Sequence, residues 1–258
     1  MNAMNDAQSV AVQHALAIEL EHVTKAFQGR AVLKDITVKV AVGKTFCLLG
    51  RSGTGKSVTL KIMVGLIQPD RGKIMIQGKE IRHRDHEILT GMRRQMGFLF
   101  QNGALFDSIS VGENVAFPLR RHTRKSEDEI RSIVQEKLKE VELEKEGAKM
   151  PSELSGGMLK RAGLARALAL DPRILLIDEP SSGLDRITAR EIYDLLLRLK
   201  KNRHVTSVVV THDVSGARRF ADEFGVLDEG HIVACGPHEE LARSDNQLVR
   251  ELMAGSET

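Results

Sequence analysis

The sequence predicts an α/β fold with a parallel sheet that is covered on both faces. After residue 154, helical and strand-like segments alternate regularly, which is typical of such sheets. Earlier, an apolar run at residues 46–49 ends directly at a glycine-rich segment, and a helical pattern follows. With 258 residues and 41% hydrophobic content, the chain can bury the core of one large domain. In the second half we expect a helix to about residue 170, a strand at 174–177, a helix at 189–199 and a strand at 205–210.

The first half has a different character. Strand-like patches at residues 17–23, 36–40 and 73–76 make the opening portion β-rich. From residue 80 to 150 the chain is polar and helical, with one strand expected at 96–100. Within this region, a capping box of Ser126 and Glu129 predicts the start of a helix. The apolar residues that share one face of that helix are Ile130, Ile133, Val134, Leu138 and Val141.

The glycine-rich segment matches the pattern GxxxxGK(S/T). It consists of Gly50, Arg51, Ser52, Gly53, Thr54, Gly55, Lys56 and Ser57. Glycines let backbone N–H groups approach one polyphosphate at the start of a helix. We expect Lys56 to reach the β- and γ-phosphates and the Ser57 hydroxyl to ligate Mg²⁺. The alternative, a glycine-rich surface turn, is weakened by the strand in front, so the sequence predicts a nucleoside triphosphate site.

Two further segments carry groups suited to phosphate chemistry. The apolar strand expected at 174–177 ends in Asp178 and Glu179, at the edge where α/β sheets place ligands. We expect Asp178 to orient the Mg²⁺ shell and Glu179 to polarise a water molecule, although an ordinary strand end could also carry two acids. Residues Ser155, Gly156 and Gly157 predict a helix N-terminus that attracts an anion. Taken alone, this segment is better explained as a simple helix cap with a tight turn.

Composition excludes several other classes. The 38 basic residues nearly balance the 35 acidic ones, and a chain with 8 Phe, 1 Tyr and no Trp has few stacking platforms, so we expect no nucleic-acid partner. Residues 1–16 do not resemble a signal peptide, and the apolar runs are far shorter than the ~18 residues needed to span a bilayer. We therefore expect a cytoplasmic protein whose membrane role comes from a partner. Cys47 and Cys235 are expected to be reduced thiols.

The order of these motifs resembles that of ATP-binding-cassette (ABC) ATPases from about residue 17 to residue 240. The resemblance implies a P-loop NTPase with a RecA-like parallel core, an N-terminal antiparallel β subdomain and an inserted α-helical subdomain. It implies one domain at 17–245, with the helical subdomain at about 102–160 and tails at 1–16 and 246–258. It also implies ATP and Mg²⁺ as ligands.

Individual residues acquire roles through the same resemblance. Phe27 occupies the position of the aromatic residue that stacks on the adenine ring. Gln101 occupies the position of the glutamine that contacts Mg²⁺ and takes part in catalysis. Glu179 becomes the catalytic glutamate, and His212 the switch histidine, although His212 alone would be taken for a surface residue. Residues 154–158 correspond to the signature motif and 182–185 to the D-loop, so Asp185 joins the nucleotide-binding set. Departures from the usual pattern are Val58, which we still count in the nucleotide-binding set, Met158 and Gly183.

The resemblance also implies an assembly. In these ATPases the signature of one subunit caps ATP on the P-loop of another, so we expect a homodimer. Residues 114–120 and 150–158 resemble ATPase subunits of Mla-type transporters, which move phospholipids with an integral membrane permease and a mammalian-cell-entry (MCE) lipid-binding protein. The chain would then lie peripherally on the cytoplasmic face of the inner membrane. Leu105, Phe106, Val115 and Phe117 would receive the permease, or else close the subdomain's own core.

Two other functions remain open from the sequence. The chain could energise an importer for another small solute, because the cargo is selected by the permease. It could also be a soluble ATP-dependent clamp without a permease. The short span of about one hundred residues between the P-loop and the signature, without sustained heptads, disfavours the clamp.

Overall fold

A computed structural model describes residues 15–82 and 85–255 of the chain. The larger of its two sheets has six strands in the order β10-β9-β3-β8-β7-β6. The neighbouring pairs among β9, β3, β8, β7 and β6 are parallel, as the sequence predicts, whereas β10 is an antiparallel edge strand. The strands are β3 (Thr45–Leu49), β6 (Met96–Leu99), β7 (Ile174–Asp178), β8 (Thr206–Val210), β9 (Glu223–Asp228) and β10 (His231–Gly236).

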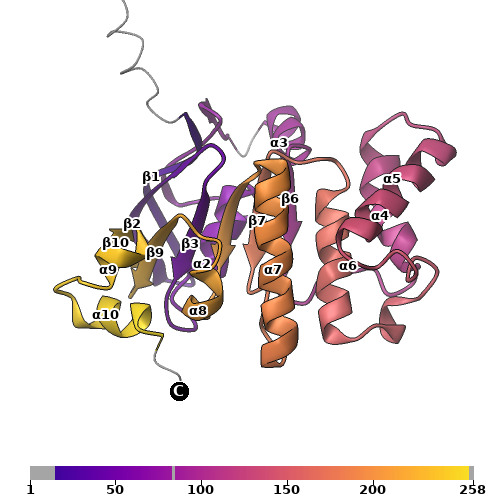
Figure 1. Cartoon of the computed structure of the whole chain (residues 1–258). Helices are drawn as coiled ribbons and strands as arrows, with labels where there is room; N and C mark the ends of the chain where they lie inside the picture. Colours follow the sequence, from indigo (N-terminus) through magenta and orange to yellow (C-terminus); the bar gives the residue numbers. More distant parts are fainter. Residues whose placement is uncertain (1–14, 83–84, 256–258) are drawn as a thin grey trace, which may run out of the picture.

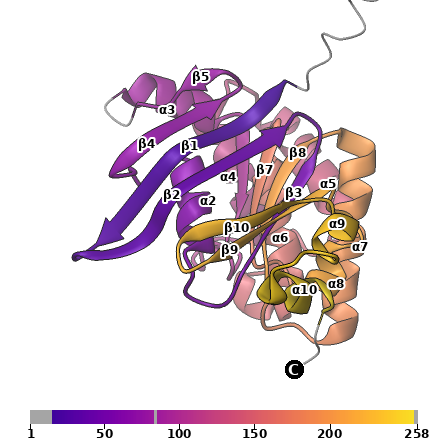
Figure 2. The ribbon, with the colours of Figure 1, turned by 90° about the vertical axis from the view of Figure 1, so that its left-hand side faces the viewer.

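The smaller sheet is antiparallel and packs beside the first (Figure 2). Its order is β2-β1-β4-β5, and β1 and β2 form a long hairpin. The strands run further than the sequence patches indicate: β1 (Leu16–Phe27), β2 (Arg30–Ala41), β4 (Arg71–Ile76) and β5 (Lys79–Glu80). The expected tail at residues 1–16 lies outside the described residues except for its last two, and Leu16 belongs to β1.

Helices cover the larger sheet and extend beyond it, and α4, α5 and α6 form a helical end of the molecule (Figure 1). The predicted capping box of Ser126 and Glu129 is present at the start of α5. The helices are α2 (Lys56–Met63), α3 (His86–Arg93), α4 (Val111–His122), α5 (Glu127–Glu140), α6 (Gly156–Leu168), α7 (Arg186–Arg203), α8 (Val214–Ala217), α9 (His238–Leu241) and α10 (Gln247–Met253), with a 3₁₀ turn η1 (Pro151–Glu153).

Two apolar clusters form the core, one on each face of the six-stranded sheet. Because neighbouring strand residues point to opposite faces, Leu48 and Val208 join the cluster beneath the antiparallel sheet, and Cys47 and Val209 join the cluster beneath the helices. Each strand through the middle of the sheet is therefore apolar on both sides, and β3, β7 and β8 are buried along their whole length. This rigid centre fixes the loops that leave their carboxyl ends.

The segment expected as a C-terminal tail contains α10, which Asn246 caps. Val249 and Met253 are buried in the cluster beneath the helices, and the Met253 carbonyl oxygen lies 3.2 Å from His238 Nε2. The tail is thus packed on the domain as far as residue 253. None of the helices in the described part of the chain is long and apolar enough to cross a membrane.

Candidate functional site

The glycine-rich segment forms the turn between β3 and α2. Gly55 has φ 107°, in the left-handed region, and a Cβ atom there would lie 2.8 Å from Leu33 Cδ2. A Cβ atom at Gly50 would lie 2.3 Å from the Leu227 carbonyl oxygen. Both positions therefore require glycine. Gly55 supplies no side-chain cap to α2, so the first turn of the helix keeps N–H groups that an anion can accept.

Lys56 is buried within this turn. Its Nζ donates hydrogen bonds to the carbonyl oxygens of Gly50 at 2.8 Å and Arg51 at 3.0 Å, and lies 4.0 Å from Glu179 Oε1. Burial lowers the pKa of the Lys56 ammonium, while the nearby carboxylates of Glu179 and Asp178 oppose that shift. The ammonium is therefore oriented toward the loop that would surround a polyphosphate.

The remaining loop residues divide by exposure. Ser52 and Gly53 are exposed, and Thr54 Oγ1 donates to the Arg51 carbonyl oxygen at 2.9 Å. The Val58 side chain packs against the apolar cluster beneath the antiparallel sheet. Val58 is therefore partly buried, with its side chain directed toward the core.

Ser57 and Asp178 meet at the start of α2 and the end of β7. Ser57 Oγ donates to Asp178 Oδ1 at 2.9 Å. Hydroxyl and carboxylate oxygens are ligands that Mg²⁺ prefers, so this pair fits the expected ion. Gln101 follows β6, the neighbour of β7 in the sheet, and is exposed.

Glu179 and His212 are also brought together, because they follow the adjacent strands β7 and β8. His212 Nδ1 lies 2.9 Å from Glu179 Oε2. Glu179 is 8% exposed and has φ 47°, an uncommon left-handed conformation for a residue other than glycine. Its N–H donates to the Val210 carbonyl oxygen at 2.8 Å, which holds this turn against β8.

The signature segment caps α6 as the sequence predicts. Ser155 Oγ accepts from the Met158 N–H at 3.3 Å. Gly157 also has a packing reason to be glycine, because a Cβ atom would lie 2.4 Å from Thr188 Cγ2. Thr188 lies in the first turn of α7, whose N-cap is Asp185. Within the described part of this single chain, no hydrogen bond joins Ser155 to residues 50–57.

Phe27 lies at the end of β1 with 43% of its surface exposed. Lys25 Nζ lies 5.3 Å from the centre of its ring, and the same ammonium donates to Asp70 Oδ1 at 2.8 Å. One ring face is therefore in contact with a cation, while the ring remains accessible to a stacking partner.

Two residues near these loops were not predicted from the sequence. Lys160 Nζ donates to the carbonyl oxygens of Gln101 and Glu179, and Tyr193 Oη bonds to Ser181 Oγ and Thr211 Oγ1. Helical spacing gives a weak signal for Lys160, because it shares a face with Leu164 and Leu168 and should be buried with them.

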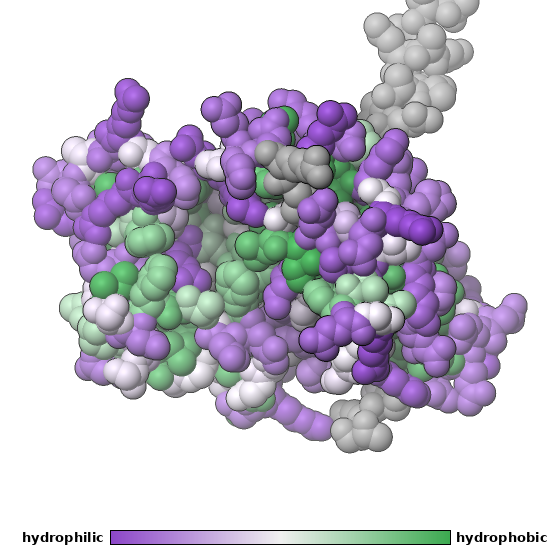
Figure 3. Space-filling view, turned by 180° about the vertical axis from the view of Figure 1, so that it is seen from behind, coloured by the Kyte–Doolittle hydropathy of each residue, from purple (hydrophilic) through white to green (hydrophobic). Residues whose placement is uncertain are grey.

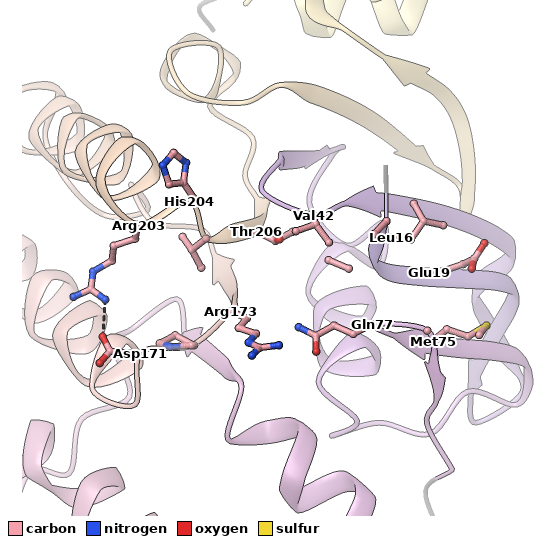
Figure 4. Close-up of a pocket in the computed structure, with 15 residues that line it drawn as sticks. Leu16, Glu19, Val42, Met75, Gln77, Asp171, Arg173, Arg203, His204 and Thr206 are labelled. Atoms are coloured by element: carbon pink, nitrogen blue, oxygen red, sulfur yellow. Dashed lines mark hydrogen bonds and ion pairs between the residues drawn. The ribbon is translucent and has the colours of Figure 1, made fainter. Parts of the chain in front are cut away.

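A large hollow lies away from these loops. It measures about 1040 Å³ and lies at the amino ends of β7 and β8, beside the antiparallel sheet (Figure 4). Arg203 points toward Asp171 at its edge, and Arg173 and Gln77 extend toward each other across it. Because none of the expected nucleotide-site residues lines it, size alone does not locate the phosphate chemistry.

Comparison with known proteins identifies the family. The family model for ABC transporters matches residues 33–182. The chain belongs to the ABC transporter family. It is 46% identical over 240 residues to the probable ribonucleotide transport ATP-binding protein mkl of Mycobacterium leprae. That alignment covers 93% of this chain and 69% of the relative. It is 40% identical to the intermembrane phospholipid transport system ATP-binding protein MlaF of Haemophilus influenzae, covering 92% and 90%.

The fold comparison agrees. A dimeric ATP-binding cassette, MJ0796 bound to ADP and Pi, aligns with a TM-score of 0.79 and 35% identity over 85% of this chain and 98% of that one. The expected ABC ATPase fold is therefore confirmed. This ABC protein is the ATP-binding and ATP-hydrolysing subunit of a transporter.

Proposed function

We propose that this ABC ATPase drives phospholipid transport together with an integral membrane permease and an MCE-type lipid-binding protein. The observation that carries the proposal is the similarity to MlaF, which extends over 92% of this chain and 90% of its relative. The relative named for ribonucleotide transport aligns over only 69% of its own length. A peripheral position on the cytoplasmic face of the membrane follows from this assembly.

Lys56 and the N–H groups of the Gly50–Gly55 turn hold the triphosphate in this proposal. The Ser57 hydroxyl and the Gln101 side-chain oxygen would hold Mg²⁺, and Asp178, which accepts from Ser57, would help to orient the shell of the ion. When bound, Mg²⁺ neutralises charge on the β- and γ-phosphates.

Glu179 and His212 carry out hydrolysis. The Glu179 carboxylate accepts the proton of a water molecule whose oxygen attacks the γ-phosphorus, and the bond to the β,γ-bridging oxygen breaks to leave ADP. His212, 2.9 Å from Glu179 Oε2, orients that carboxylate and contacts the γ-phosphate. Their joint position at the carboxyl ends of β7 and β8 supports these roles.

A homodimer completes the site. Ser155, Gly156 and Gly157 of one copy place the N-terminus of α6 against the γ-phosphate held by Lys56 of the other, and Asp185 lies at the same interface. The absence of a hydrogen bond between Ser155 and residues 50–57 within the described part of one chain is what this arrangement requires.

The permease docks on the helical end of the molecule, where hydrophobic side chains gather on the left of Figure 3. Phe106 and Phe117 are 45% and 46% exposed, and their ring centres lie 4.9 Å apart. Buried Asn114 holds the preceding loop to α4, because its Oδ1 accepts from the Phe106 N–H at 2.8 Å and its Nδ2 donates to the Phe106 carbonyl oxygen at 3.0 Å.

Val115 and Leu105 do not belong to this exposed aromatic surface. Val115 is fully buried, so of the two expectations for it the structure favours the second, that it closes the subdomain's own core, and Leu105 is partly buried against the same cluster. An apolar helical period does not distinguish a docking face from a core face. The surface offered to the partner is the aromatic pair.

Transport by the whole complex tests the function. The ATPase, permease and MCE-type protein are purified together and placed in liposomes with fluorescent phospholipid, and ATP-dependent lipid movement is measured. A parallel assay with radiolabelled ribonucleotide tests the competing cargo. Lys56→Ala is the control: lipid movement that persists undiminished with this variant would show that the chain does not drive it, and ribonucleotide uptake without lipid movement would overturn the cargo.

A further inference from the structure

Lys160 on α6 joins two loops that surround the proposed site. The residue is only 5% exposed. Its Nζ donates to the Gln101 carbonyl oxygen, to the Glu179 carbonyl oxygen at 2.9 Å and to Ser182 Oγ at 3.2 Å. An ammonium has three N–H donors, so all of them are used. Gln101 lies in the loop after β6, and Glu179 and Ser182 both lie in the loop between β7 and α7.

These contacts stabilise a strained turn. Glu179 has φ 47°, and a residue other than glycine keeps this conformation only when its surroundings hold it. Its N–H is bound to the Val210 carbonyl oxygen and its side chain to His212. Lys160 binds the carbonyl oxygen of the same residue. The backbone of Glu179 is therefore held on one side by β8 and on the other by α6.

The contacts differ from those of an ordinary buried ion pair. The oxygens that Lys160 binds belong to two carbonyl groups and a hydroxyl, all of them neutral. Burial lowers the pKa of the Lys160 ammonium, and the carboxylates of Glu179 and Asp178 oppose that shift. Placing a cation here therefore has a cost that these hydrogen bonds offset.

We propose that Lys160 is a positioning residue for ATP hydrolysis, which couples the placement of α6 to the geometry of Gln101 and Glu179. The inference rests on the proposed roles of those two residues. Since Ser155 caps the same helix, movement of α6 would shift the signature segment and the hydrolytic loops together. Lys160 acts through Glu179 and Gln101 and does not touch the nucleotide.

Lys160→Met tests this by removing the donors while keeping the side chain's length. We expect kcat for ATP hydrolysis to fall at least about tenfold, with the ATP dissociation constant within about threefold of the wild-type value. Lys160→Arg should recover part of kcat, because a guanidinium group can donate to several carbonyl oxygens. If Lys160→Met does not fold, Lys160→Arg and Lys160→Gln replace it. We then expect kcat to decrease from wild type to Lys160→Arg and further to Lys160→Gln.

Lys137→Met is the matched control. Lys137 is also a buried lysine, 1% exposed on α5, and pairs with Glu136 and Asp171. Its loss should lower the melting temperature and leave kcat unchanged. The proposal is overturned if every folded Lys160 variant keeps wild-type kcat, or if ATP affinity falls as much as kcat. Lys56→Ala in the same assay tests the proposed nucleotide site separately from the role of Lys160. Hydrolysis that survives in Lys56→Ala would reject the nucleotide site, whatever the Lys160 variants do.

Discussion

The hydroxyl of Tyr193 lies 2.9 Å from Ser181 Oγ and links α7 to the loop that carries Glu179. The same hydroxyl lies 3.3 Å from Thr211 Oγ1, next to His212. Tyr193 is 1% exposed, and burial raises the pKa of its phenol far above the ordinary value, so the group is neutral. One buried hydroxyl thus connects the segments after β7 and β8.

Tyr193→Phe removes that hydroxyl and keeps the ring, which packs against Gly216 and Phe220. We expect the free energy of unfolding to fall by about 1–2 kcal/mol, since Ser181 loses a buried partner. We also expect kcat to fall severalfold with little change in KM, because the loops bearing Glu179 and His212 lose a common anchor. Chemical denaturation and steady-state ATPase kinetics measure both. Wild-type values of stability and kcat together would contradict this link.

Glu179→Gln separates nucleotide binding from hydrolysis. The amide can keep a hydrogen bond to His212 but cannot take a proton from water, so kcat should fall by roughly 10²–10⁴ while ATP remains bound. In saturating Mg-ATP the variant should accumulate as a dimer of about twice the 28.5 kDa subunit mass. Light scattering after size exclusion measures this, with Lys56→Ala as the monomeric control. A Glu179→Gln protein that stays monomeric under these conditions would rule out the ATP-bridged dimer.

Local patterns predicted the parts of the site that lie next to one another in sequence. The turn at residues 50–57, the acids at the end of β7 and the Ser126 capping box are each set by short-range physics, namely backbone freedom, strand polarity and helix-end hydrogen bonding. Strands β9 and β10 were missed. β10 alternates exposed and partly buried residues, and its role as an antiparallel edge depends on pairing with β9, which the sequence does not display.

Long-range contacts explain the other omissions. Lys160 and Tyr193 act through partners up to 59 positions away along the chain, so local patterns do not reveal those contacts, even where helical spacing indicates that Lys160 is buried. The role of Val115, permease contact or core, stayed open for the same reason. Its helical period is correct, but only the packing of α4 on α5 and α6 shows that the face is internal.

Gly157→Ala tests whether packing or phosphate binding requires the second signature glycine. The new methyl group would lie 2.4 Å from Thr188 Cγ2, and Thr188 cannot turn away without breaking its 2.6 Å hydrogen bond to Asp185. We expect a loss of stability of about 1–3 kcal/mol from overpacking. Adding Thr188→Ser removes the opposing methyl group and keeps the hydroxyl, so the double variant should recover most of the loss in a denaturation experiment.

Gly156→Ala serves as the companion variant, because its Cβ atom would lie 3.3 Å from Leu184 Cδ2, the end of a flexible side chain. It should keep near-wild-type stability. If the double variant that combines Gly157→Ala with Thr188→Ser remained as unstable as Gly157→Ala alone, the clash with Thr188 would not be the cause.

Asp171 provides a prediction about acid stability. Burial by itself would raise the pKa of this carboxyl group, but hydrogen bonds from Lys137 and Arg203 outweigh it and hold the pKa below the ordinary value. A carboxyl group whose pKa is lower in the folded state than in the unfolded state stabilises the fold above its unfolded pKa of roughly 4. That contribution is lost as the pH falls through the folded-state pKa.

Asp171→Asn should therefore lower the urea midpoint at pH 7, where the wild-type carboxylate is charged and paired. The difference between variant and wild type should shrink as the pH falls below about 4, because the wild-type group is then protonated as well. Asp107→Asn, at an exposed position in the loop before α4, is the matched control for the loss of one surface carboxylate, and its urea midpoint at pH 7 should stay close to that of the wild type. The outcome against this prediction is a difference in urea midpoint between Asp171→Asn and wild type that stays constant from pH 7 to about pH 3. Side-chain packing, and not the charge paired with Lys137 and Arg203, would then account for the contribution of Asp171 to stability.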